Sequence, residues 1–258
     1  MIKAKRITID GINVAYKRCC ETNQPKGVIL FLHGWQGSSN SWISNIEELC
    51  NYFDCLALDL PGFGESPKPN KIWDIYDYAK FLVDFISAMN LPQFTLVGKS
   101  FGGRIAIVFS TSWPERLKSL VLVSAAGTEK RSTQSLLKIL LAKVGKFATK
   151  LMPFIKPEPL RQKYYKVMSI PDEKDSYKRE VKKRVTNQKL SSLLTKIKIP
   201  TLIVWGSDDK ILPIGIARRM LGMINNARLV IVEKAGHDAH ETHPKEFDRY
   251  LLDFLGQK

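Results

Sequence analysis

Residues that bind metals are scarce in this sequence. Its 258 residues include four cysteines and four histidines. The cysteines form no C-x-x-C pair and have no histidine near them at the spacing of a zinc site; they are Cys19, Cys20, Cys50 and Cys55. We therefore expect free thiols, with neither a zinc ion nor a redox dithiol.

Long hydrophobic runs are also missing. No segment approaches the roughly 18 apolar residues that a membrane-spanning helix needs, and the first residues, MIKAKRITIDG, lack the apolar core of a signal peptide. The sequence thus predicts a soluble cytoplasmic protein with no stable membrane insertion. Its hydrophobic content of 44% is sufficient for a sizeable core.

Acidic residues are depleted in one segment. The formal net charge is +15, but residues 128–199 hold 19 lysines and arginines against 6 acidic residues, which leaves 21 against 19 elsewhere. Because the excess is confined to this segment and the rest of the chain is nearly balanced, we expect no nucleic-acid partner.

Buried strands alternate with helical patterns along the rest of the chain. Asp10-Gly11 separates two β-rich segments, which predicts an N-terminal hairpin. Continuous apolar runs are typical of parallel strands buried on both faces; they lie at 27–32, 55–58, 94–97, 120–123, 201–204 and 229–232. Helical patterns follow at 41–52, 73–89, 101–113, 214–224 and 244–255. This order predicts a mostly parallel, eight-stranded α/β sheet flanked by helices.

The basic segment interrupts this alternation. It shows helical patterns and no convincing strand, and its apolar stripe at 136–147 has lysines largely on the opposite side. We expect an α/β core at 1–127 and 191–258, with a basic helical cap at 128–190 whose apolar stripe packs over the site.

The stretch LVGKSFGG at 96–103 is compatible with two different motifs, a phosphate-binding loop and a nucleophile elbow. Gly98-Lys99-Ser100 could close a phosphate-binding loop, but the glycine that such a loop needs five places earlier is Gln93. Gly98 to Gly102 also spells G-x-S-x-G, with an apolar strand directly before it and an apolar helix directly after. Strand, sharp turn and helix are what a nucleophile elbow requires, so the pattern favours Ser100 as a nucleophile.

A serine nucleophile needs a base, and histidine is the usual one. His237 follows Gly236 after the last strand, and it is our candidate because active residues gather at the carboxyl ends of strands in open α/β sheets. Either Asp208 or Asp209, which both follow another strand, could orient its imidazole. We expect His240 and His243 to be surface or loop residues.

Taken together, these motifs resemble the α/β-hydrolase superfamily, in its serine esterase and carbon–carbon hydrolase branch. His33-Gly34-Trp35 and the loop DLPGFGES at 59–66 complete the likeness. The resemblance implies a Ser100, Asp209, His237 triad, with the acid three residues after Gly206, and an oxyanion hole formed by the backbone N–H groups of Trp35 and Phe101.

The resemblance also bears on two other residues. It implies that His33 is a structural histidine bracing the oxyanion loop. Lys99 departs from the family pattern, in which many relatives carry histidine at this position. A cation near the site could depress the pKa of His237, but we expect the Lys99 side chain to extend or pair away from the chemistry.

The expected activity is hydrolysis of a carboxylic ester through an acyl-Ser100 intermediate, with a small-molecule ester as substrate and no cofactor. The basic cap would suit an anionic ester. One alternative is hydrolysis of a carbon–carbon bond in a β-diketone-like substrate with the same triad. Another is a non-catalytic ligand receptor on the same fold.

Overall fold

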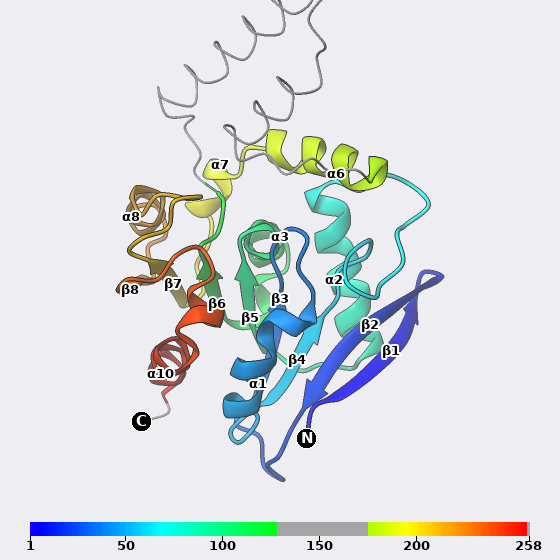
Figure 1. Cartoon of the computed structure of the whole chain (residues 1–258), viewed down its shortest axis with the longest axis horizontal. Coiled ribbons are helices and arrows are strands. Elements are labelled where there is room, and N and C mark those ends of the chain that lie inside the picture. Colours follow the sequence, from blue (N-terminus) through cyan, green and yellow to red (C-terminus); the bar gives the residue numbers. More distant parts are fainter. Residues whose placement is uncertain (128–174, 257–258) are drawn as a thin grey trace, which may run out of the picture. The chain divides into compact units, whose positions relative to one another are not determined.

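The computed structural model describes residues 1–127 and 175–256. They contain one sheet of eight strands in the order β1-β2-β4-β3-β5-β6-β7-β8 (Figure 1). Pairs β1/β2 and β2/β4 are antiparallel, and every other pair is parallel. The strands are β1 Lys3–Ile9, β2 Ile12–Cys19, β3 Val28–Leu32, β4 Asp54–Leu58, β5 Phe94–Lys99, β6 Leu117–Val123, β7 Thr201–Gly206 and β8 Ala227–Val232. The predicted sheet is confirmed.

The N-terminal hairpin turns on the predicted dipeptide. Asp10 and Gly11 have φ values of 48° and 77°, and Ile9 pairs directly with Ile12. A two-residue turn with positive φ at both positions matches the twist of the flanking strands, which explains why Asp-Gly is found here.

The central strands are buried on both faces, as their continuous apolar sequences predict. Every residue of β3 and β4 is buried. Alternate residues such as Ile29 and Phe31 join the cluster under α1 (Ile43–Leu49) and α10 (Pro244–Phe254). Leu32 points the other way, toward α3 (Phe101–Ser112). The sheet therefore lies between two helical layers.

The remaining helices follow the predicted pattern closely. Helix α2 (Ile75–Ala88) begins at a capping box, in which the side chains of Asp74 and Asp77 each accept the other's backbone N–H. The others are α6 Ser176–Asn187, α7 Ser191–Leu194, α8 Gly215–Leu221, α9 Ala239–Thr242 and two short 3-10 helices, η1 Ser39–Trp42 and η2 Pro114–Arg116. None of the helices among the described residues is long and apolar enough to cross a membrane.

The chain divides into two compact units, residues 1–128 with 181–258, and residues 129–180. The predicted cap, 128–190, and its apolar stripe at 136–147 lie mostly outside the described residues, so both stay predictions. Within the first unit, the buried Arg104 donates to the carbonyls of Ala126 and Val185 at 3.1 and 2.6 Å. Its guanidinium thus joins the two stretches of chain that form the first unit.

Candidate active site

Ser100 occupies a sharp turn between β5 and α3. Its backbone has φ 49° and ψ −101°, a conformation that residues other than glycine rarely adopt. The N–H of Ser100 is held by the carbonyl of Val123 at 2.9 Å. A strained residue between a buried strand and a helix is the geometry of a nucleophile elbow and leaves no room for a phosphate-binding loop.

Three glycines make this turn possible. A Cβ on Gly98 would lie 2.6 Å from the carbonyl oxygen of Gly102. One on Gly102 would lie 2.6 Å from the carbonyl oxygen of Leu32, and one on Gly103 would lie 2.4 Å from Cβ of Ala125. Only glycine lets the helix approach the sheet this closely.

Asp209 and His237 are brought together at the carboxyl edge of the sheet. Oδ2 of Asp209 lies 2.8 Å from Nδ1 of His237. Oδ1 of the same carboxylate accepts the N–H groups of Ile211 and Leu212 at 2.9 and 2.8 Å. The two backbone N–H groups therefore hold one oxygen of Asp209, and the other oxygen contacts Nδ1 of the imidazole. Nε2 of His237 is left to exchange a proton with another group.

The carboxylate of Asp209 is held in its charged form. Burial would raise its pKa, but the hydrogen bonds from His237 and Leu212 outweigh burial, and the pKa lies below its ordinary value. Asp208 makes no such contact, because its side chain accepts from the Ser207 hydroxyl at 3.1 Å. Of the two aspartates left open by the strand position alone, only Asp209 contacts the histidine.

The backbone N–H groups of Trp35 and Phe101 have no hydrogen-bond acceptor among residues 1–127 and 175–256. Phe101 opens helix α3, where an N–H has no partner within the helix. Two open donors near the elbow are what an oxyanion hole needs. Within the described residues, no hydrogen bond joins the Ser100 hydroxyl to His237.

His33 braces the loop that carries Trp35. The imidazole is fully buried, and its Nε2 accepts the N–H of Leu60 at 3.1 Å. Nδ1 must then carry the proton, and it donates to the carbonyl of Gly34 at 2.7 Å. Burial lowers the pKa of His33 to about 4, so the ring stays neutral. These contacts match the structural role expected for it.

The family assignment follows from a match over most of the chain. The family model described as alpha/beta hydrolase fold matches residues 27–169 and 158–244. This chain belongs to that family. It is a hydrolase, and its sheet and N-terminal hairpin agree with the fold.

Known relatives of this hydrolase are named for different substrates. It is 28% identical to a 2-hydroxy-6-oxononadienedioate/2-hydroxy-6-oxononatrienedioate hydrolase 1 of Pseudomonas putida, over 95% of this chain and 92% of the relative. It is 26% identical to human monoacylglycerol lipase ABHD6, over 89% and 75% of the two chains. A solved membrane phospholipase A has the same fold, with TM-score 0.80 and 24% identity, over 99% of this chain and 86% of that one.

Aromatic rings surround the open donors in this hydrolase. The ring of Trp35 lies 5.0 Å from that of Phe63 and 5.3 Å from that of Phe101. Tyr78 packs edge-on to Phe101 at 5.2 Å. On another side, the Lys182 ammonium lies 5.8 Å from the centre of the Trp35 ring. The surroundings of the Trp35 ring are thus largely aromatic, with the Lys182 ammonium beside it.

Lys99 and His240 differ in how far the sequence anticipated them. Lys99 is paired, as expected, but its partner is Asp238, directly after His237, so the side chain stays beside the loop of the proposed base. His240, expected at the surface or in a loop, is fully buried in α9, with its ring 4.1 Å from that of Trp42. That expectation is wrong, because α9 packs this ring against the core. Burial lowers the pKa of His240 to about 3.

His243 lies between α9 and α10 and is half-buried.

The four cysteines are free thiols, as expected, but two of them lie close together. Sγ of Cys19 lies 2.9 Å from Sγ of Cys50, and both are buried. The carboxylate of Glu21 joins them within 4.8 Å. Spacing along the chain could not reveal this cluster, because Cys19 ends β2 and Cys50 directly follows α1, 31 residues later. Burial raises the pKa of Cys50 to about 12, which keeps this thiol protonated.

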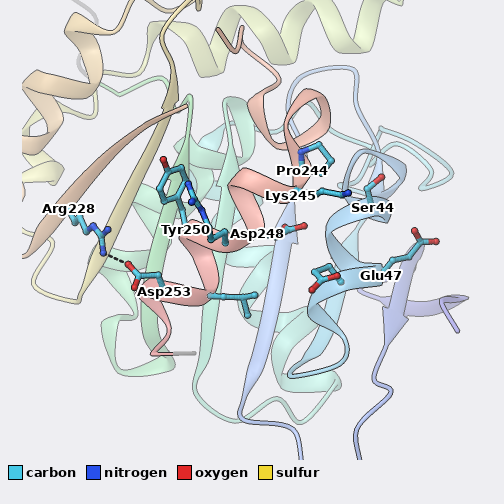
Figure 2. Close-up of a pocket in the computed structure, with 11 residues that line it drawn as sticks. Ser44, Glu47, Arg228, Pro244, Lys245, Asp248, Tyr250 and Asp253 are labelled. Carbon is cyan, nitrogen blue, oxygen red and sulfur yellow. Dashed lines mark hydrogen bonds and ion pairs between the residues drawn. The ribbon is translucent and has the colours of Figure 1, made fainter. Parts of the chain in front are cut away.

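A groove in the protein surface lies away from Ser100 and His237. This groove, of about 900 Å³, runs between α1, α10 and β8, with Asp248 and an ion pair of Arg228 and Asp253 at 2.6 Å among its residues (Figure 2). None of the predicted site residues lines it. The groove has a charged lining, and it lies among the helices on the face of the sheet opposite to α3. It is therefore distinct from the turn at Ser100.

Proposed function

We propose that this hydrolase cleaves a carboxylic ester through an acyl-Ser100 intermediate. The Ser100 hydroxyl attacks the carbonyl carbon as its proton passes to Nε2 of His237, and Asp209 stabilises the imidazolium that forms. The N–H groups of Trp35 and Phe101 bind the developing oxyanion. The imidazolium then protonates the departing alcohol, and water, activated by the same histidine, releases the acid and restores Ser100.

The observation that carries this proposal is the pairing of Asp209 with His237 beside a strained serine. The 2.8 Å contact fixes the histidine tautomer and leaves Nε2 free to act as a base. The φ of 49° at Ser100 supports a nucleophile presented to substrate, since strain of this kind persists only where the surrounding structure enforces it. The human lipase relative supports an ester as the scissile group.

Hydrolysis of a carbon–carbon bond is the second candidate. The Pseudomonas putida relative, whose name describes hydrolysis of an oxo-dienedioate, favours it. The same Ser100, Asp209 and His237 would serve a β-diketone-like substrate. Rates measured side by side for p-nitrophenyl esters of increasing acyl length and for a carbon–carbon hydrolase substrate decide between the two.

A fluorophosphonate probe tests whether Ser100 is activated at all. We expect labelling of the native protein and its loss in Ser100→Ala, with ester turnover reduced by about 10⁴- to 10⁶-fold. Ser124→Ala is the matched control, because Ser124 also has a positive φ of 42° and directly follows the neighbouring strand β6. Turnover by Ser100→Ala within tenfold of the native protein would refute the mechanism. A native protein that takes up no probe and turns over no ester would favour the ligand receptor instead.

We further propose that the substrate is a small anionic ester. The charge excess of the segment at 128–199 and the position of Lys182 beside Trp35 support this extension. The proposal includes a helical cap at 128–190 that admits substrate, and no cofactor.

A further inference from the structure

Lys99 and Asp238 form an ion pair between the two loops that carry the proposed nucleophile and base. Lys99 directly precedes Ser100, and Asp238 directly follows His237. The Lys99 side chain is 12% exposed and that of Asp238 47% exposed, so the pair lies at the edge of the protein interior. A contact here joins the end of β5 to the loop after β8, which do not pair within the sheet.

The Lys99 side chain also reaches the third loop of the site. A Cβ added to Gly34 would lie 2.8 Å from Cδ of Lys99 and 3.1 Å from its Nζ. The alkyl chain of Lys99 therefore lies against the backbone that leads into Trp35. One side chain thus contacts the loop of the proposed oxyanion hole and, through its ammonium, the loop of His237.

We propose that Lys99 is a positioning residue, which holds the loops of Ser100, His237 and Trp35 in register and, together with Asp238, keeps the charge beside the base balanced. This inference rests on the proposed function. Lys99 does not touch the reacting atoms in this scheme, and it acts through its neighbours. Lysine combines a long apolar stem with a cation. Here the stem packs against Gly34 and the ammonium pairs with Asp238.

The charged groups around His237 fix the sign of the expected effect. Asp209 and Asp238 face it as carboxylates, while the nearby His240 is neutral because burial keeps its pKa at about 3. Burial would raise the pKa of Asp238, but the Lys99 contact outweighs it and the pKa lies below its ordinary value. Glu241, further along α9, has a pKa raised by burial. Lys99 and Asp238 therefore present a nearly neutral pair to the imidazole.

Removing Lys99 or Asp238 leaves net charges of opposite sign beside the imidazole of His237. Lys99→Met keeps much of the alkyl contact with Gly34 but leaves the negative Asp238 beside the base, which stabilises the imidazolium. Asp238→Asn leaves the positive Lys99, which destabilises it. We expect the acidic midpoint of the kcat/KM profile to rise by about half a unit to one unit in the first variant and to fall by a similar amount in the second.

The experiment measures kcat and KM for a neutral p-nitrophenyl ester from pH 5 to 9 at about 20 mM salt. It uses Lys99→Met, Asp238→Asn, the double variant and Asp208→Asn as the control. In the double variant the midpoint should return close to that of the native protein. Its kcat should stay roughly 10- to 100-fold low with KM nearly unchanged, because the loops have lost their tie. Asp208→Asn should match the native protein in both respects.

Opposite shifts that cancel in the double variant cannot come from general loosening of the fold. Midpoints that move in the same direction, or that stay within about 0.2 units of the native value, would overturn the inference. Probe labelling separates this failure from that of the proposed function. If the native protein is labelled at Ser100 but the midpoints do not move, only the role of Lys99 is wrong, whereas absence of labelling removes the proposed function as well.

Discussion

Oδ2 of Asp209 lies 2.8 Å from Nδ1 of His237 across 28 residues of chain. The aspartate follows β7 and the histidine follows β8, so the parallel pairing of these two strands brings the loops together. The adjacent Asp208 has the same charge and almost the same position along the chain, but it contacts Ser207 instead. The pair of aspartates therefore offers a natural comparison.

Asp209→Asn should reduce ester kcat far more than Asp208→Asn. An asparagine cannot stabilise the imidazolium, and its amide would favour the wrong tautomer of His237, so we expect a loss of about 10³- to 10⁴-fold at neutral pH. Asp208→Asn should stay within about threefold of the native rate. Steady-state kinetics on one p-nitrophenyl ester checks both variants. The reverse order of effects would reassign the acid.

Gly102→Ala should damage both the fold and the elbow. Its Cβ would lie 2.6 Å from the carbonyl oxygen of Leu32 and 2.8 Å from that of His33. Helix α3 would have to move from the sheet, and we expect the free energy of unfolding to fall by about 2 to 4 kcal/mol. Gly215→Ala in α8 is the control, because its new Cβ meets nothing closer than 3.7 Å. Urea denaturation that shows equal stability for the two variants would contradict this account of the glycine.

Asp248→Asn should stabilise the protein in a pH-dependent manner. Burial raises the pKa of Asp248 to about 7, against the opposing hydrogen bond from Asn45. The folded protein thus keeps a proton that the unfolded chain loses near pH 4, and native stability falls as the pH rises from 4 to 7. The variant lacks this loss and retains an oxygen to accept the amide of Asn45, 2.8 Å away in the native protein.

We expect Asp248→Asn to gain about 1 to 3 kcal/mol over the native protein at pH 8 and almost nothing at pH 4.5. Denaturation curves at the two pH values measure the difference. Asp253→Asn, on the same helix but paired with Arg228 near the surface, should change stability by less than about 1 kcal/mol at either pH. A gain for Asp248→Asn that is the same at both pH values would show that charge is not its cause.

The sequence was most informative where a residue type has a local reason for its position. Asp10-Gly11 predicts its turn because few dipeptides tolerate two positive φ values, and the apolar run of β3 predicts burial on both faces. The sharp turn at Ser100 was predictable for the same reason, since glycines on both sides of a serine between strand and helix have a steric purpose. Each of these patterns can be read within a few residues.

Contacts between distant segments were not accessible in the same way. His240 lies on a helix of four residues, too short to show a periodic pattern, and nothing nearby indicates that Trp42 covers it. Arg104 was missed because its carbonyl partners, Ala126 and Val185, flank the insertion, and a lone arginine in an apolar helix carries no signal for them. The partnership of Lys99 with Asp238 likewise depends on how two loops meet.

Lys182 offers the sharpest test of an electrostatic preference for anionic esters. Its ammonium lies 5.8 Å from the centre of the Trp35 ring, beside the loop of the proposed oxyanion hole. A cation there should raise the local concentration of an ester that carries a carboxylate but leave a neutral ester unaffected. We expect Lys182→Met to lower kcat/KM for the anionic ester by about 3- to 10-fold and to change the neutral ester by less than twofold.

Lys183→Met and salt complete this test, because they separate the position of a charge from the total charge. Lys183 is the next residue and is exposed, so its loss removes the same charge without emptying the space beside Trp35. It should leave the preference nearly intact. Screening acts over roughly 10 Å at 0.1 M salt, so raising salt from about 20 to 500 mM should remove most of the preference of the native protein and little of what remains in Lys182→Met. If both lysine variants lost the preference equally, the basic segment as a whole would attract the substrate, and Lys182 would have no special place in it.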